Sequence, residues 1–85
     1  MHVAAPQAQL ESVLWEPSLP RAHRVRVREH TCIGQNPQFE LCTAGGLWFV
    51  RRTSVGASTG IVESAWVSAS AANELWGRLL SGQVR

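Results

Sequence analysis

The chain contains no lysine, no aspartate and no tyrosine, so every basic residue is an arginine and every acidic residue is a glutamate. Eight arginines against six glutamates give a net charge of +2, which is too small to indicate nucleic-acid binding by itself. The glutamates are scattered singly, so the paired-carboxylate signature of general acid–base catalysis is also missing. The positions of the arginines therefore matter more than their number.

Long apolar segments are absent as well. No apolar run approaches the roughly 20 residues that a bilayer-spanning helix needs. Residues 1–15 lack both the basic region and the apolar region of a secretory signal peptide. We therefore expect a cytoplasmic protein with no membrane segment.

Cysteine is scarce, because Cys32 and Cys42 allow one disulfide at most. In a cytoplasm we expect both thiols to stay reduced. The functional alternative is a metal site formed by His30, Cys32 and Cys42. Its spacing contains no Cys-x-x-Cys pair and offers only His23 as a fourth ligand, so we expect no bound metal.

Motifs of the common enzyme classes are missing too. The chain has neither a P-loop nor a dinucleotide-binding glycine fingerprint. His30 and Cys32 are two residues apart, but no nucleophile-elbow context surrounds them. We therefore expect a protein that is not an enzyme and that binds no cofactor.

What the chain does contain is 45% hydrophobic residues, an ordinary share for one small globular domain. Pro6, Pro17 and Pro20 set residues 1–20 apart as an N-terminal arm, in which residues 6–15 could form a short helix. The remaining residues, 21–85, are expected to form a single domain. Their first segment, residues 21–30, alternates with period two, which predicts a strand.

The stretch FELCTAGGLWFVRRT, residues 39–53, predicts an antiparallel hairpin. Gly45 and Gly46 can adopt the positive φ angles that a tight turn requires. Residues 61–68 predict a fourth strand, and the apolar residues of 68–82 fall on one side of a C-terminal helix in which Gly77 would permit close packing on the sheet. The predicted fold is therefore α+β, with a small antiparallel four-stranded sheet, a C-terminal helix packed on one face and an extended N-terminal arm.

One helix can cover only one face of such a sheet. If it covers Val25 and Val27, the face with the arginines of the first strand has no cover within the chain, and an uncovered face is a natural dimer or partner surface. Tryptophan often anchors such surfaces, although each of Trp48, Trp66 and Trp76 could equally fill the core. Trp15, in the arm, is expected to be exposed or exchanged onto a second copy. The predicted interface residues are Leu14, Trp15, Trp48, Val50 and Trp66.

Nucleic-acid binding is the alternative function. Arginines two apart on an extended strand lie roughly 6.5–7 Å from each other, which is near the spacing of backbone phosphates. The bland interpretation is a solvated face whose arginines pair with Glu40 and Glu63 on neighbouring strands. The residues of the nucleic-acid alternative are Arg24, Arg26, Arg28, Arg51 and Arg52.

The stretches FELCTAGGLWFVRRT and ANELWGRLLSGQVR together resemble the small BldB-like regulatory proteins of filamentous actinobacteria. Proteins of this group are often encoded beside helix-turn-helix regulators. The resemblance leaves out the N-terminal arm. It implies a self-associating homodimer in transcriptional or developmental control, a protein partner such as a helix-turn-helix regulator, and no catalytic residues.

Overall fold

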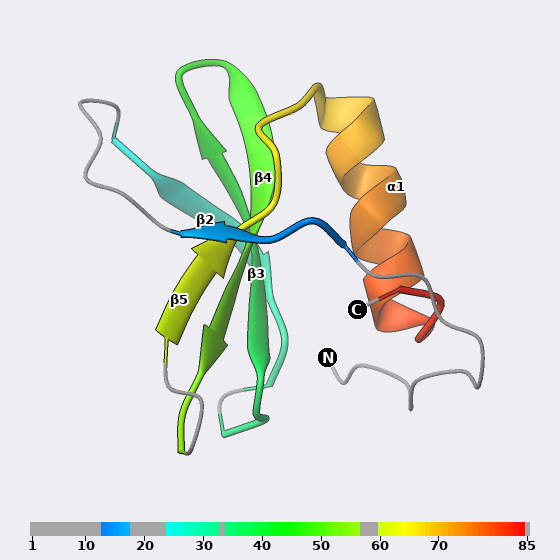
Figure 1. Cartoon of the computed structure of the whole chain (residues 1–85). Helices are drawn as coiled ribbons and strands as arrows, with labels where there is room; N and C mark the ends of the chain where they lie inside the picture. The colour runs from blue at the N-terminus through cyan, green and yellow to red at the C-terminus, as the bar shows by residue number, and fades with distance from the viewer. Residues whose placement is uncertain (1–12, 18–23, 33, 57–59, 85) are drawn as a thin grey trace.

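The computed structural model describes residues 13–17, 24–32, 34–56 and 60–84 (Figure 1). All strands in these ranges join one antiparallel sheet in the spatial order β1-β5-β4-β3-β2, and the helix packs on one face of it. The α+β fold predicted from the sequence is confirmed, and β1 adds a fifth strand. The elements are β1 (Glu16–Pro17), β2 (Arg26–His30), β3 (Gln38–Ala44), β4 (Leu47–Ser54), β5 (Gly60–Glu63) and α1 (Ala69–Leu80).

Strands β3 and β4 form the predicted hairpin at the centre of the sheet. Ala44 lies opposite Leu47, so only Gly45 and Gly46 remain for the turn. Their φ angles are 57° and 80°, as a two-residue turn with positive φ at both central positions requires. This turn fixes the register that places Leu41 opposite Val50.

Side chains along each strand alternate between two faces, because neighbouring residues of a strand point to opposite sides. Leu41 and Val50 point to the face that carries α1, which is called the helix face below. Cys42 and Phe49 are opposite one another on the other face, which is called the second face. Both faces of β4 are covered at this point, since Phe49 on the second face and Val50 on the helix face are each 0% exposed.

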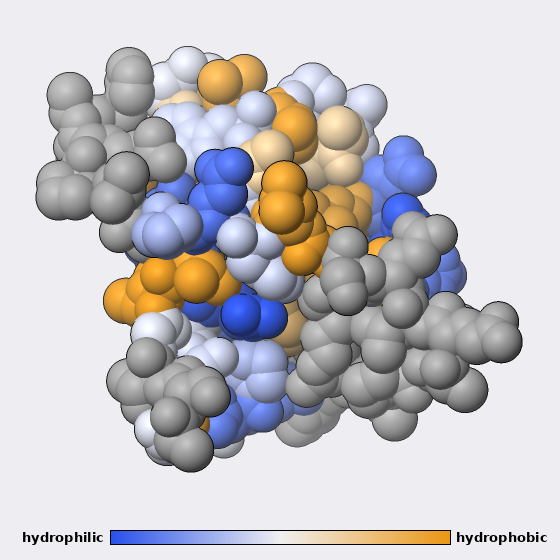
Figure 2. All heavy atoms as spheres, in the orientation of Figure 1, coloured by the Kyte–Doolittle hydropathy of each residue, from blue (hydrophilic) through white to orange (hydrophobic). Residues whose placement is uncertain are grey.

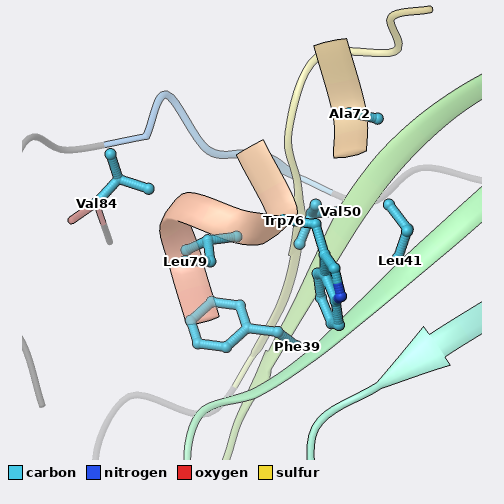
Figure 3. Close-up of a cluster of buried hydrophobic side chains, with 7 residues drawn as sticks. All are labelled: Phe39, Leu41, Val50, Ala72, Trp76, Leu79 and Val84. Atoms are coloured by element: carbon cyan, nitrogen blue, oxygen red, sulfur yellow. The ribbon is translucent and has the colours of Figure 1, made fainter. Parts of the chain in front are cut away.

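The main core lies between the helix face and α1. In Figure 3 the side chains of Trp76 and Leu79 point from the helix toward those of the sheet. Val13, Trp15 and other half-buried residues pack around them. The buried residues of this core are Phe39, Leu41, Val50, Ala72, Trp76, Leu79 and Val84.

Both ends of α1 have the residues that a helix terminus needs. The Ser68 hydroxyl oxygen accepts a hydrogen bond from the Ala71 N–H at 3.3 Å, which is the usual interaction of an N-cap serine. Gly82 follows the helix with a φ of 76°, a left-handed conformation that suits glycine. Gly77 was expected to allow close packing on the sheet, but it is exposed and nothing lies within 4 Å of the position of an added Cβ.

Strand β2 differs from the prediction in the direction of its side chains. A β-bulge shifts the register between Val27 and Glu29. Arg26 lies opposite Thr43 and therefore points to the helix face, whereas Val27 lies opposite Cys42 and points to the second face. The expectation that the helix covers the valines of this strand was wrong, because Val25 and Val27 lie on the second face, opposite the face that carries α1.

The described part of the arm, residues 13–17, joins the sheet through β1. The helix predicted over residues 6–15 falls mostly outside the described residues, and its last three, Val13 to Trp15, are not helical. They lead into β1, which pairs with β5. Within the described ranges no helix is long and apolar enough to cross a membrane.

Candidate interaction surface

The second face is apolar at the end nearest the β3–β4 turn. Cys42, Ala44 and Phe49 form a small buried cluster there, and Val25 and Trp66 pack against it. The Trp66 indole lies flat on the Phe49 ring, with centroids 4.6 Å apart and planes 3° from parallel. Trp66 comes from the connection between β5 and α1. On the second face it is therefore a loop side chain that covers Phe49, whereas α1 covers the helix face.

Two exposed apolar side chains lie beside this cluster, and a third lies farther along the same face. Val27 and Leu47 are each 43% exposed, and Ile61, opposite Thr53 farther along the sheet, is 51% exposed. Strand alternation places all three on the second face. Figure 2 shows that exposed apolar residues form separate patches among hydrophilic ones on the side of the molecule in view. This mixture of apolar and charged groups is usual for protein interfaces.

A row of charged residues crosses the second face next to the apolar cluster. The register brings Glu40, Arg51 and Glu63 side by side on β3, β4 and β5. The Arg51 Nε donates to Glu40 Oε1 at 2.9 Å, and this hydrogen bond raises the pKa of Arg51. Glu63 is 4% exposed, and its Oε1 accepts a hydrogen bond from the Trp66 Nε1 at 3.1 Å. The row therefore holds Trp66 in place over Phe49.

The thiol of Cys42 lies inside the apolar cluster. Burial raises its pKa to about 11, an effect that the nearby Arg51 partly opposes. At neutral pH the thiol is therefore protonated and is a poor nucleophile or metal ligand. His30, from the same proposed metal site, lies with its Nδ1 2.8 Å from the Thr31 carbonyl oxygen. In the part of the chain that the structure describes, no three His, Cys, Asp or Glu residues gather as a metal site would require.

The predicted interface residues are divided between the two faces. Trp66 is half-buried on the second face, whereas Trp48 is half-buried on the helix face. Val50 is 0% exposed within the main core, so its assignment to an interface was wrong. Trp15 was expected to be exposed or exchanged onto a second copy; in the structure it is half-buried against Phe39 of its own chain, with ring centroids 6.1 Å apart. Leu14, beside it, is 78% exposed.

The arginines of the nucleic-acid alternative are divided as well. Arg24, Arg26 and Arg28 are all exposed, and the Arg28 guanidinium lies 5.8 Å from the centroid of the Trp48 ring. Arg51 is on the second face, and Arg52 is on the helix face with its guanidinium 4.8 Å from the Trp15 ring centroid. Arg51 and Arg52 therefore do not extend the β2 arginines into one patch.

The expected partners of the β2 arginines are elsewhere. Glu40 and Glu63 lie on the second face in the row of Arg51, and Glu40 pairs with Arg51. Arg26 points to the opposite face. The cross-strand pairing of Glu40 and Glu63 with the β2 arginines was therefore a wrong expectation.

Comparison of the chain with known proteins gave no match to a family model, to a curated protein or to a solved structure.

Proposed function

We propose that this protein is a non-enzymatic regulatory module that self-associates and binds a protein partner in the cytoplasm. The observation that carries the proposal is the second face, which has exposed apolar residues around the Phe49–Trp66 stack. The resemblance to BldB-like proteins favours a role in transcriptional or developmental control, with a helix-turn-helix regulator as the partner. The raised pKa of Cys42 argues against this thiol as a nucleophile.

Covering the rim of the second face would stabilise a complex. Burial of a large apolar side chain that was fully exposed contributes about 1.5–3 kcal/mol, so Val27, Leu47 and Ile61, each about half exposed, offer roughly 1 kcal/mol apiece. The aromatic stack beside Val27 and Leu47 gives this part of the surface a rigid anchor of the kind that often dominates binding. The charged row beside it would help to fix the orientation of a partner.

The face of the sheet is a better docking surface than its β2 edge. Strand β2 carries a bulge and four charged or ionisable side chains among its five residues. Bulges and charges on an edge strand oppose pairing with a further strand. We therefore assign partner binding to the second face.

Sedimentation velocity of the purified chain at low micromolar concentration tests self-association. We expect a mass of two chains. A single-chain mass across this concentration range would contradict this half of the proposal.

Calorimetric titration with a candidate partner of the helix-turn-helix class, which the resemblance implies, tests partner binding. Leu47→Glu and Ile61→Glu place a charge on the second face, and each should weaken binding by about tenfold or more. Ala71→Glu adds the same charge on the exposed side of α1 and serves as the matched control. Equal affinity for all three variants would contradict the assignment of the surface.

Nucleic-acid binding is kept as a second candidate function because of one observation. Three arginines, Arg24, Arg26 and Arg28, are exposed at the β2 edge, and the Arg28 guanidinium lies 5.8 Å from the centroid of the Trp48 ring. Phosphate contacts depend strongly on salt, whereas apolar contacts do not, so salt dependence separates the two functions.

A further inference from the structure

The second face carries more acidic than basic residues. Glu16 lies opposite Glu63 and so continues the charged row of Glu63, Arg51 and Glu40 onto β1. His30, opposite Glu40 on β2, ends the row and is counted as neutral. Among the described strand residues of this face, three negative charges and one positive charge therefore give a formal sum of −2. The whole chain has a net charge of +2, so this face is opposite in sign to the molecule.

The helix face has the opposite sign. Arg26 and Arg52 point to it, and the guanidinium of Arg28 lies over the ring of Trp48 on the same side. Glu29 is the one acidic residue among the described strand residues there, so their formal sum is +2. The two faces of one sheet therefore present different charges to a partner. Such a separation orients a charged partner as it approaches.

Two carboxylates of the second face can be reached from outside. Glu16 is exposed and forms no ion pair with a residue that the structure describes, and it lies directly opposite the carboxylate of Glu63. Like charges at paired strand positions repel each other. The Glu40 side chain is 21% exposed, and Arg51 occupies one of its two oxygens. A cation from another molecule would relieve the repulsion at Glu16 and bond the remaining oxygens.

The same charges oppose the other occupants of this face. Two second faces in contact would bring together six glutamates and two arginines, because each copy contributes three and one. Like charges brought together at an interface are strongly unfavourable, so a second copy is a poor occupant. Nucleic acids and anionic membranes carry the same sign as this face and are excluded for the same reason. The apolar residues beside the row require an occupant that also has apolar side chains.

We propose that the second face binds a cationic amphipathic segment of a protein partner. Apolar side chains of this segment cover Val27, Leu47 and the Phe49–Trp66 stack. Its lysines or arginines meet the carboxylates of Glu16 and Glu40. The apolar contacts supply most of the affinity, whereas the charges select the partner and reject acidic segments. The inference rests on the proposed function, because it names the chemistry of the partner that docks on this face.

Two synthetic peptides test the sign of the partner's charge. Both are amphipathic helices of about 18 residues with the same leucine stripe, and one has lysine wherever the other has glutamate. Fluorescence anisotropy of the labelled peptides measures their affinities for the purified chain. We expect the lysine peptide to bind at least about tenfold more tightly than the glutamate peptide. Equal affinities, a preference for the glutamate peptide, or no binding of either peptide at about 1 mM would overturn the inference.

Charge reversal at Glu16 tests the position of the contact. Glu16→Lys should weaken binding of the lysine peptide by about threefold to tenfold and strengthen binding of the glutamate peptide. Glu74→Lys makes the same change on the exposed side of α1 and should leave both affinities unchanged. Glu40→Gln removes the other carboxylate and provides the test if Glu16→Lys fails to fold. Affinities that respond to neither Glu16→Lys nor Glu40→Gln would overturn the inference.

Leu47→Glu separates this inference from the proposed function. It places a charge beneath any occupant of the second face, so it should weaken binding of either peptide there. If Leu47→Glu weakens binding and Glu16→Lys does not, the cationic chemistry is overturned and the docking surface stands. If Leu47→Glu also has no effect, the second face is not the docking surface, and both the inference and the assignment of partner binding are overturned.

Discussion

The reactivity of the Cys42 thiol should depend on how well Trp66 covers the second face. The side chain is 0% exposed in the cluster with Phe49, and Trp66 packs against that cluster. Its pKa is raised from 9.0 to about 11, chiefly by burial. Only the thiolate reacts with alkylating reagents, so reaction of Cys42 requires both deprotonation and access.

We expect iodoacetamide to label Cys42 in the folded protein far more slowly than in the unfolded chain. A pKa difference of about two units alone reduces the thiolate fraction roughly 100-fold below pH 9, and the difference should shrink as the pH rises toward 11. Peptide-resolved mass spectrometry measures the rates. Trp66→Ala should accelerate labelling, and Trp48→Ala, on the other face, should not. Equal rates in the folded and unfolded chains would contradict the buried position.

The Glu40–Arg51 ion pair should make a measurable contribution to the free energy of unfolding. Both side chains are partly exposed, 21% and 26%, so solvent screens their attraction. Glu40→Gln should lower the free energy of unfolding by about 0.5–1 kcal/mol, with a smaller effect at high salt. Urea denaturation measures it, with Glu74→Gln on the exposed side of α1 as the control. A loss of several kcal/mol would mean that the charged row is much less hydrated than its exposure indicates.

At the scale of elements, two glycines should respond in opposite ways to the same substitution. Gly46 has a φ of 80° in the hairpin turn, whereas Gly77 is in the interior of α1, and an added Cβ would meet nothing within 4 Å at either position. Gly46→Ala should destabilise the fold by about 1–2 kcal/mol, because alanine is strained in the left-handed region. Gly77→Ala should stabilise it by about 0.5–1 kcal/mol through helix propensity. Thermal unfolding of the two variants checks both signs.

The hairpin and the helix were predictable because their signals are local. Gly45 and Gly46 stand between two apolar runs, and the spacing of Trp76 and Leu79 gives α1 one buried side. The faces of β2 were not predictable, because alternation does not say on which face of the sheet the helix packs, and the bulge after Val27 depends on pairing with β3. Strand β1 was missed since two residues, one of them proline, carry no periodic pattern.

The same limits explain which parts of the candidate surface were found. The sequence indicated that one helix leaves a sheet face without cover, and it named Trp66 among the anchors. It missed the rim residues Val27, Leu47 and Ile61, since exposure of an apolar side chain depends on which elements pack beside it. Their membership of one face becomes visible only when the register of β2 to β5 is known.

For the whole molecule, the two faces of the sheet are covered by different segments. Trp15 docks on the helix face, whereas Trp66 and the apolar rim lie on the second face. The exposed apolar side chains that a partner could cover therefore lie opposite the face on which the arm docks.

Salt dependence is the property of the whole molecule that decides between protein binding and phosphate binding. Three phosphate contacts from Arg24, Arg26 and Arg28 would give a slope of about −3 in a plot of log affinity for duplex DNA against log salt. We expect no such binding, and we expect self-association to change little between about 50 and about 500 mM NaCl, because apolar contacts dominate it. Sedimentation with and without duplex DNA measures both. A DNA complex with the steep slope, lost in the triple Arg→Glu variant, would make the β2 edge the functional surface instead.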